Sequence, residues 1–484
     1  MMLSSKIFKE LLVKFQPLDF KLIAGLENSD QLRTKHYSVI CIDEILKKML
    51  ENDWGMCSNN GFNYLYNGAY WEVINRDELH TFLGLAAERM GVSLIDSKHY
   101  IFKAELYNQF LSASVMPVLT STDNVTQINL QNGTFEITPE YQKLRDFHRS
   151  DFLKYQLPFL YDINAESPLF QSYLDTVLPD PDAQKVLAEY LGYVFIQPST
   201  LKLEKLLLLF GSGANGKSVF FDIVNALLGK ENISSYSLQK ITGSDYSRAQ
   251  LHGKLVNYAS EISGSLDTAV FKQLVSGEPV EARLPYGRPF TLTNYAKLIF
   301  NCNELPKEVE HTDAYFRRFL IVPFNVTIKK DQQDNKLSEK IIAMELSGIF
   351  NWVLAGLKRL LQQQGFTEHR AGLQLVEQYR HESDSVSLYL EDKNYQPSQK
   401  DHISISYLYE WYRDFCKMGG FSPLNKINFK RRLEHLGIET KRLNSGNVAC
   451  LNVPGTKVIE PTEALTAGNG EKSEKVQPTA NTIF

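Results

Sequence analysis

Five apolar residues lead directly into a glycine-rich loop in the stretch Leu206-Leu207-Leu208-Leu209-Phe210-Gly211-Ser212-Gly213-Ala214-Asn215-Gly216-Lys217-Ser218. A pattern typical of a helix follows over residues 219–228. Glycines allow backbone N–H groups to close around phosphate oxygens, while Lys217 adds a positive charge and Ser218 offers a hydroxyl to Mg²⁺. The strand, loop and helix together predict a P-loop, in which residues 211–218 bind a nucleoside triphosphate.

Two later apolar runs are followed by polar residues that suit the chemistry of this loop. Residues 255–259 and 296–300 have the composition of buried parallel strands, so we expect an α/β core with crossover helices. Glu261 follows the first run, where a carboxylate can hold Mg²⁺ or polarise water. Asn303 follows the second run, where an amide can orient the attacking water or contact the γ-phosphate. An ordinary solvated turn is the alternative for Glu261.

Two adjacent arginines, Arg317 and Arg318, precede a further apolar run that ends at Phe324. An arginine in this position could act as an arginine finger on the nucleotide of a neighbouring subunit. A surface ion pair is the plain alternative for either side chain. Four such elements in this order are harder to obtain by chance than any one of them alone.

In order and spacing, these motifs resemble the superfamily 3 helicases of the AAA+ class, and specifically the helicase part of phage, plasmid and poxvirus primase-helicases. Residues 66–78 and 128–162 are similar to the family's domain before the motor, and residues 407–437 to its C-terminal module. The resemblance implies a hexameric ring with ATP and Mg²⁺ at its subunit interfaces. Such a ring moves along single-stranded DNA and unwinds duplex at a replication origin or fork.

The resemblance also implies roles for individual positions. The family's catalytic residues correspond to Lys217, Glu261, Asn303 and Arg318, the last because it stands six residues before Phe324. Lys272 matches a basic position that reaches across the interface to phosphate. Ser260 departs from the pattern, because the family has its first acid there. The departure implies that Ser218 and water contribute more to Mg²⁺ ligation, beside Glu261, which would serve as catalytic base.

A predicted hairpin over residues 280–292 is the first candidate for DNA contact, since two short strand-like runs flank a Pro/Gly turn. In the resembling family this insertion lines the central pore. Arg283 and Arg288 are placed to contact phosphates, and Tyr286 could stack on a base or sugar. A plain surface hairpin is the alternative.

The second candidate lies near the C-terminus. Residues 424–453 carry six basic and two acidic side chains, a local charge of +4, although the whole chain has a net charge of −4. A predicted helix followed by a turn resembles a winged-helix module, in which Lys430, Arg431 and Arg432 could meet duplex origin DNA. A solvated basic helix face is the alternative.

The expected architecture is an AAA+ P-loop NTPase core with an α+β N-terminal domain and a small winged-helix-like module. The chain has 484 residues, so we expect several domains: 1–160 before the motor, the motor in 161–370, the module in 385–453 and a disordered tail in 454–484. Hairpin turns are predicted at Asn67-Gly68 and Asn132-Gly133. Residues 337–364 predict one long helix, or a pair broken near Gly348.

The five scattered cysteines suit a reducing cytoplasm, and we expect no signal peptide and no stretch of membrane-spanning length. Two other functions remain open beside the helicase. A replication initiator would use ATP only to switch a ring on origin DNA, and a small-molecule P-loop kinase would need no ring. Translocation polarity, origin sequence, host and a separate primase partner are not given by the sequence.

Overall fold

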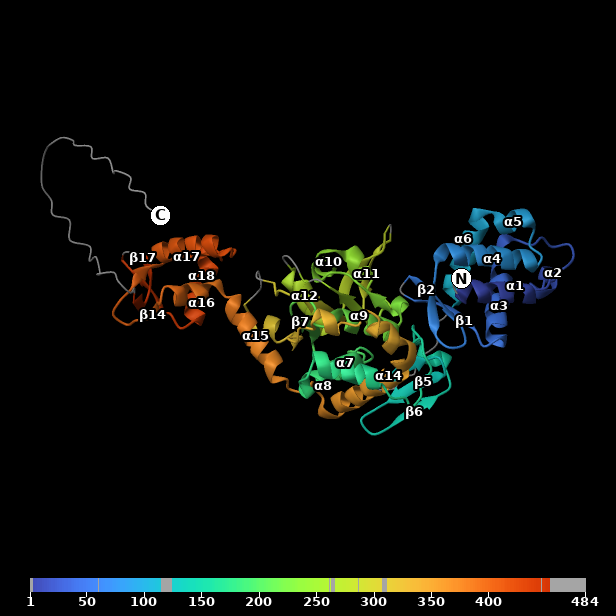
Figure 1. Ribbon diagram of the computed structural model, residues 1–484. Helices are drawn as coiled ribbons and strands as arrows, with labels where there is room; N and C mark the ends of the chain where they lie inside the picture. The colour runs from blue at the N-terminus through green and yellow to red at the C-terminus, as the bar shows by residue number, and fades with distance from the viewer. Residues whose placement is uncertain are drawn as a thin grey trace, which may run out of the picture. The chain divides into compact units, whose positions relative to one another are not determined.

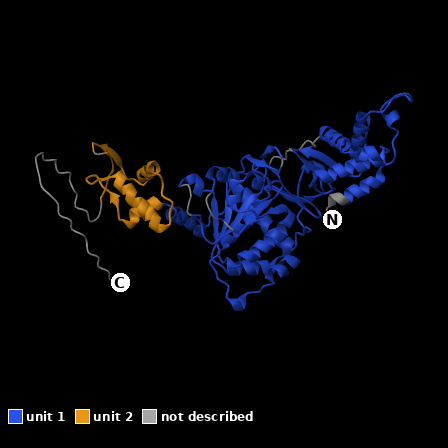
Figure 2. Cartoon of the chain, turned by 90° about the horizontal axis from the view of Figure 1, so that it is seen from above, with its two compact units in different colours: residues 1–384 blue, residues 385–484 orange. Residues whose placement is uncertain are grey.

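The computed structural model describes residues 3–59, 61–114, 124–260, 262, 266–285, 287–306, 311–444 and 446–452. Glu261, Tyr286 and the predicted tail, residues 454–484, therefore lie outside the described residues. The chain divides into two compact units, residues 1–384 and 385–484 (Figure 2). Each unit is mixed α/β and has its own hydrophobic core.

A parallel sheet lies at the centre of the first unit, with the strand order β13-β7-β12-β9-β8. Its strands are β7 (Leu206–Phe210), β8 (Ile233–Ser234), β9 (Val256–Ala259), β12 (Lys297–Cys302) and β13 (Phe319–Pro323). The apolar runs predicted as buried parallel strands are thus confirmed. Since β7 lies between β12 and β13, the loops after β7 and β12 emerge side by side at the carboxyl edge of the sheet.

Helices cover both faces of this sheet, because alternate side chains of β7 enter different cores. Leu207 and Leu209 pack with helices α7 (Pro168–Val177), α8 (Pro181–Tyr193), α9 (Lys217–Leu228) and α14 (Leu337–Gln363). Leu206 and Leu208 pack with α10 (Leu238–Gly243), α11 (Asp245–Ala249), α12 (Thr268–Ser276), α13 (Asp313–Phe316) and α15 (Arg370–Glu382). Figure 1 shows α7, α8 and α14 on one side of β7 and α10 to α12 on the other.

The long helix α14 is continuous over 27 residues, so the predicted alternative of a break near Gly348 is wrong. Gly348 serves close packing instead, since a Cβ there would lie 2.2 Å from the backbone oxygen of Glu166. Contrary to the expectation from sequence, α14 is long and apolar enough to cross a membrane. Half of its most apolar 18-residue stretch is buried within the unit, however, as in the core helix of a globular domain.

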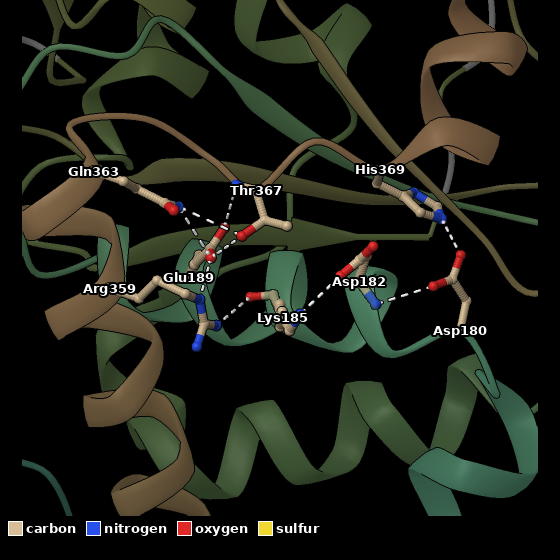
Figure 3. A network of polar contacts seen from close by, with 8 residues as sticks. All are labelled: Asp180, Asp182, Lys185, Glu189, Arg359, Gln363, Thr367 and His369. Carbon is tan, nitrogen blue, oxygen red and sulfur yellow. Dashed lines mark hydrogen bonds and ion pairs between the residues drawn. The ribbon is translucent and has the colours of Figure 1, made fainter.

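A buried carboxylate fastens α14 to α8 (Figure 3). Glu189 is fully buried and accepts hydrogen bonds from Arg359 Nε at 2.5 Å, from the backbone N–H of Thr367 at 2.7 Å and from Gln363 Nε2 at 3.2 Å. At the start of α8, Asp180 caps the helix and its Oδ2 lies 3.1 Å from His369 Nε2. These contacts hold the segment between α14 and α15 against α8.

The sheet formed by β4 (Thr126–Leu130), β5 (Gly133–Ile137) and β6 (Gln142–Arg145) shares the core of α7, α8 and α14. Phe135 and Phe159, for example, both pack against Phe350 of α14. Residues 126–159 therefore pack with the part of the chain that we assigned to the motor, ahead of the boundary expected near residue 160. The β4–β5 turn is formed by residues 131 and 132, one position before the predicted turn, because Gly133 already pairs with Leu130.

The N-terminal part has a separate core, formed by α1 (Leu3–Lys14), α2 (Phe20–Ile23), α3 (Thr34–Glu51), α4 (Arg76–Arg89), α5 (Leu94–Lys98) and α6 (Tyr100–Ala113). The predicted hairpin is present as β2 (Phe62–Tyr66) and β3 (Trp71–Ile74). A strand that we did not predict, β1 (Gly55–Asn59), pairs with β2. Asn75 caps α4 by accepting a hydrogen bond from the backbone N–H of Asp77 at 2.8 Å.

The second unit is built from α16 (Ser385–Asp392), α17 (Ile405–Gly419) and α18 (Lys426–His435), with short strands β14 (Gln396–Pro397), β15 (Ile403–Ser404), β16 (Thr440–Leu443), β17 (Gly446–Ala449) and β18 (Leu451–Asn452). Its core contains Tyr389, Leu408, Tyr412 and Phe429. The predicted helix followed by a turn is present as α18 and the antiparallel pair β16–β17.

Candidate nucleotide site

The loop of residues 211–218 is fixed at several points. Gly216 begins α9 with φ 87°, a conformation that favours glycine, and a Cβ there would lie 2.7 Å from Val177 Cγ1. The Tyr173 hydroxyl donates to the Gly216 carbonyl at 2.9 Å. Asn215, which is buried, donates through Nδ2 to the carbonyl of Phe324 at 3.0 Å. Helix α7 and the end of β13 therefore hold the loop in shape.

Lys217 is buried in this loop. Its ammonium donates to the carbonyls of Gly211 and Ser212, the latter at 3.3 Å, and to Asn303 Oδ1 at 3.3 Å. Burial lowers the pKa of the Lys217 ammonium below its ordinary value. The structure thus brings together two of the predicted catalytic residues, Lys217 and Asn303, from loops that follow neighbouring strands.

The predicted magnesium ligands are only partly described, because Glu261 lies outside the described residues. Ser218, in the first turn of α9, and Ser260, at the end of β9, are both exposed. Within the described ranges, no group of three His, Cys, Asp or Glu side chains could hold a metal ion. Mg²⁺ commonly keeps several waters and takes few protein ligands beside phosphates, so a sparse donor set fits an ion that enters with a nucleotide.

Cys302, the residue before Asn303, was not singled out by its sequence. Its thiol is buried, and Sγ donates to the Glu304 carbonyl at 2.6 Å. Burial raises the pKa of the Cys302 thiol to about 11, so it stays protonated and acts as a small apolar residue beneath the site. No sequence signal distinguishes it from the other four cysteines.

The two arginines differ sharply in exposure. The Arg318 side chain is 8 % exposed and donates to Ser276 Oγ at 2.8 Å, with Glu204 Oε2 at 3.4 Å. The Arg317 side chain is 61 % exposed and lies 2.8 Å from the same Glu204 oxygen. An arginine finger must reach out of its own chain, and in this structure Arg317 is the one placed to do so.

Glu204, which forms ion pairs with both arginines, was not predicted from the sequence. Partial burial works to raise the pKa of its carboxyl, but Arg318, Lys202 and Arg317 hold that pKa below its ordinary value. Lys272 lies on α12, one turn before Ser276, and is partly exposed. The sequence offers no signal for Glu204, because it lies more than a hundred residues before the two arginines that it engages.

The predicted DNA hairpin is present as β10 (Val280–Arg283) and β11 (Pro289–Leu292), in the register Arg283↔Pro289. Arg283 and Arg288 are exposed near its tip, and Arg283 Nε donates to the Gly287 carbonyl at 3.0 Å. Tyr286 lies outside the described residues. Arg248 of α11, not predicted, is buried and donates to the Glu281 carbonyl at 2.7 Å, which anchors the hairpin.

In the second unit, all three predicted DNA-binding residues lie on α18. Arg431 is exposed, while Lys430 and Arg432 are partly buried. Lys430 Nζ lies 3.7 Å from Glu434 Oε1 on the same helix, as an i,i+4 pair. The helix thus presents a basic surface whose charge is reduced by one neighbouring carboxylate.

Three family models match the chain in succession. Residues 43–179 match "D5 N terminal like", residues 209–318 match "Family of unknown function (DUF5906)" and residues 381–448 match "Poxvirus D5 protein-like". A curated relative, "Putative helicase L207/L206" of Acanthamoeba polyphaga mimivirus, is 25 % identical over 230 residues, which cover 45 % of this chain and 24 % of the relative. The chain thus spans about a quarter of the length of that relative.

Solved structures of the NrS-1 C-terminal region are also similar. The A-form apo structure is 12 % identical with a TM-score of 0.46, covering 84 % of this chain and 98 % of that one. A second apo structure, of residues 305–718, is 11 % identical with a TM-score of 0.45, covering 86 % and 99 %. Likeness at this level identifies neither a reaction nor a site. The matches to the D5-type models and to the mimivirus relative show that the chain is similar to the primase-helicases of the poxvirus D5 type, as its motifs predicted.

Proposed function

We propose that this chain is an ATP-dependent DNA helicase of superfamily 3, with an AAA+ core that assembles as a hexameric ring on single-stranded DNA. The observation that carries the proposal is the contact between Lys217 and Asn303, which joins the glycine-rich loop to the end of the adjacent strand β12. The strand order around β7 supports it, because the central strand carries the loop and the neighbouring strand β12 carries Asn303 at the same edge of the sheet. The cellular setting proposed is the cytoplasm, in replication of a phage, plasmid or other mobile element.

Bound ATP supplies the phosphoanhydride bond, and its Mg²⁺ ion the positive charge that offsets the phosphates. Backbone N–H groups of residues 211–218 would hold the phosphates, and Ser218 would offer its hydroxyl to Mg²⁺. Lys217 would exchange its bonds to loop carbonyls for bonds to phosphate. Asn303, released from Lys217, would orient the attacking water, and Glu261 would accept its proton.

A neighbouring subunit would complete this site. We assign the arginine finger to Arg317, because its guanidinium is exposed and only Glu204 engages it by an ion pair within the described residues. Arg318 is a positioning residue, since it ties β13 to Ser276 of α12 and shares Glu204 with Arg317. Lys272 would reach the same nucleotide across the interface.

DNA would contact two surfaces. In a ring, six copies of the β10–β11 hairpin would present Arg283, Tyr286 and Arg288 to a strand in the pore. In the second unit, a winged-helix-like arrangement of α18, β16 and β17 would present Lys430, Arg431 and Arg432 to origin duplex. An initiator that binds the origin without processive unwinding remains the alternative function. A separate primase is a further proposed partner.

A hydrolysis assay with and without single-stranded DNA tests the proposal. The variants are Lys217→Ala and a control just beyond the C-terminal end of the same helix, Lys230→Ala, whose side chain is exposed. We expect DNA to stimulate hydrolysis by the wild type and the control, and Lys217→Ala to lose about a hundredfold or more. Strand separation of a forked duplex should follow the same order. Hydrolysis that DNA does not change, together with tight duplex binding and no strand separation, would support the initiator instead.

A further inference from the structure

A second cleft of about 660 Å³ lies at the opposite end of the parallel sheet from the nucleotide loop. Residues 252–255 and 293–297 line it, and these segments precede the amino ends of β9 and β12. The glycine-rich loop and Asn303 instead follow the carboxyl ends of β7 and β12. Since these strands are parallel, the full length of β12 separates the two sites, roughly 20 Å for six residues. A ligand of this cleft is therefore not the nucleotide of the loop.

The charged side chains in the cleft are almost all basic. Lys154, Lys254 and Lys297 line it beside a neutral His252, and the described lining contains one acid, Asp151. Asp151 is already neutralised, because its carboxylate oxygens lie 2.8 and 2.9 Å from the guanidinium of Arg145. The cleft thus carries an uncompensated positive charge, which suits a ligand with several negative charges.

Two of these lysines are partly buried and, in the part of the chain that the structure describes, lack the carboxylate partners that such cations normally have. Among the described residues, neither the Lys154 nor the Lys297 ammonium forms an ion pair or donates a hydrogen bond; each ammonium lies instead over an aromatic ring. Lys154 Nζ is 5.0 Å from the centroid of Tyr64, and Lys297 Nζ is 4.1 Å from that of Tyr193. Burial lowers the pKa of Lys297 to about 8 and lowers that of Lys154. Folding would not favour two such cations unless a ligand used them.

An unsatisfied hydroxyl in the same wall is a second, independent observation. Thr126 is 4 % exposed and lines the cleft, and its Oγ1 has no hydrogen-bond partner among the residues that the structure describes. Buried hydroxyls are normally hydrogen-bonded, so an orphan donor that faces a basic cleft points to a missing acceptor. The donors present, a hydroxyl and ammonium groups, are those that contact phosphate oxygens in protein–DNA complexes.

The cations are spread over the walls of the cleft. Lys154 rests on Tyr64, Lys297 on Tyr193, and Lys254 donates to the Glu231 carbonyl, so the three ammonium groups have three separate anchors. A single triphosphate group would need donors that converge, whereas a strand offers phosphates in a row. Thr293 and Asn294 of the lining also follow directly on β11, so the cleft is continuous with the base of the hairpin.

We propose that this cleft binds the phosphate backbone of single-stranded DNA, as a second contact beyond the hairpin tip. The inference rests on the proposed function in one respect only, because that function supplies the strand. Lys154 and Lys297 would contact successive phosphates, Thr126 would donate to one of them, and His252 would remain neutral, held by the Tyr64 hydroxyl at 3.0 Å. The contact would be independent of base sequence.

The test measures binding of a fluorescent oligo(dT) to the full chain by anisotropy, without nucleotide, over a series of salt concentrations. The variant is Lys154→Met/Lys297→Met, and the control Lys185→Met/Lys340→Met removes the same charge from side chains that are 48 % and 54 % exposed. We expect the cleft variant to bind at least about tenfold more weakly, with a salt slope lower by about 1.4, since each phosphate contact on a single strand contributes about 0.7. The control should keep the wild-type slope.

Thermal unfolding separates loss of binding from loss of folding. Because the two cations have no carboxylate partner, Lys154→Met/Lys297→Met should melt at or above the wild-type temperature while it binds DNA more weakly. Equal affinity and slope in variant and wild type would overturn the inference, and so would a wild type that does not bind oligo(dT). The inference would also be overturned if the Lys217→Ala protein still bound ATP and that binding required Lys154, because the ligand of the cleft would then be a free nucleotide.

Two patterns of results distinguish a DNA-binding cleft from a helicase activity. If DNA binding depends on the cleft lysines but DNA does not change the rate of ATP hydrolysis, the helicase proposal is refuted and the cleft proposal stands. DNA-stimulated hydrolysis and strand separation with no effect of the cleft lysines on binding would refute the cleft alone.

Discussion

Replacing the two adjacent arginines one at a time should separate a catalytic role from a structural one. The Arg317 side chain is 61 % exposed and forms one ion pair, so its loss should cost about 1 kcal/mol of stability or less. The Arg318 side chain is 8 % exposed, and its loss would remove the partner of Ser276 Oγ and the more buried of the two arginines that engage Glu204. Breaking a buried pair of this kind costs about 3–5 kcal/mol, which lowers the melting temperature by on the order of 5 °C.

The effects on hydrolysis should differ in the opposite sense. If Arg317 stabilises the transition state in a neighbouring subunit, Arg317→Ala should lower the DNA-stimulated rate by about a thousandfold or more at an unchanged melting temperature. Arg317→Lys should recover little of the rate, because an ammonium cannot donate two parallel hydrogen bonds. The measurements are steady-state hydrolysis and thermal unfolding of the same preparations.

Mixing subunits gives a sharper version of the same assay. In the proposed ring, an interface would need Lys217 from one subunit and Arg317 from the next, so Lys217→Ala and Arg317→Ala proteins, each inactive, should regain part of the activity when they assemble together. Two results would refute this reasoning: no recovery on mixing, or an Arg317→Ala protein with full activity beside an Arg318→Ala protein that is inactive but as stable as the wild type. The second result would indicate that Arg318 is the arginine finger.

Three further predictions concern stability and the shape of the loop. Glu189→Gln should cost about 3 kcal/mol, measured by denaturant unfolding, because a buried amide cannot accept all the hydrogen bonds that the carboxylate accepts. Burial, reinforced by Glu78, raises the pKa of Glu72 to about 7. As the pH rises from 4.5 to 7, the Glu72 carboxyl ionises in the unfolded state before it ionises in the folded state, so the folded state loses stability over that range. Glu72→Gln should therefore raise the melting temperature above pH 7 but not at pH 4.5. The gain should be about 1–2 kcal/mol after solvent screening. Gly216→Ala should weaken nucleotide binding, measured by titration, by about tenfold or more, because the new Cβ would meet Val177 at a positive φ.

The central strands and the nucleotide loop could be predicted because their signals are local. An apolar run followed by a glycine-rich loop specifies β7 and the start of α9 without reference to the rest of the chain. The β4–β5 turn was placed one residue late, because Asn132-Gly133 is itself a strong turn signal and the register depends on which residue pairs with Leu130. The strand β1 was missed since its residues, from Gly55 to Asn59, lack any clear alternation.

Features that depend on distant segments could not be predicted. Whether Arg317 or Arg318 is exposed depends on Glu204 and Ser276, and nothing within the arginine motif indicates either partner. Gly348 suggests a break in the helix from sequence alone, and only the structure shows that the backbone of Glu166 packs against it. The basic cleft joins segments as far apart as residues 59 and 297, so no single stretch of sequence contains its charge pattern.

Strand β13 links the nucleotide loop to the arginine that would serve the next subunit. At its end, Phe324 donates its backbone N–H to Phe210 and accepts from Asn215 of the loop. At its start, the carbonyl of Arg318 accepts from the backbone N–H of Leu206, and Arg317 precedes it on the same turn. Both ends are thus fastened to β7, the strand that carries the loop. A shift of the loop on nucleotide binding would therefore reach the exposed arginine through two paired strands that cannot slide past one another without breaking their hydrogen bonds. Such a connection would allow the nucleotide state of one site to affect hydrolysis in the next site of a ring.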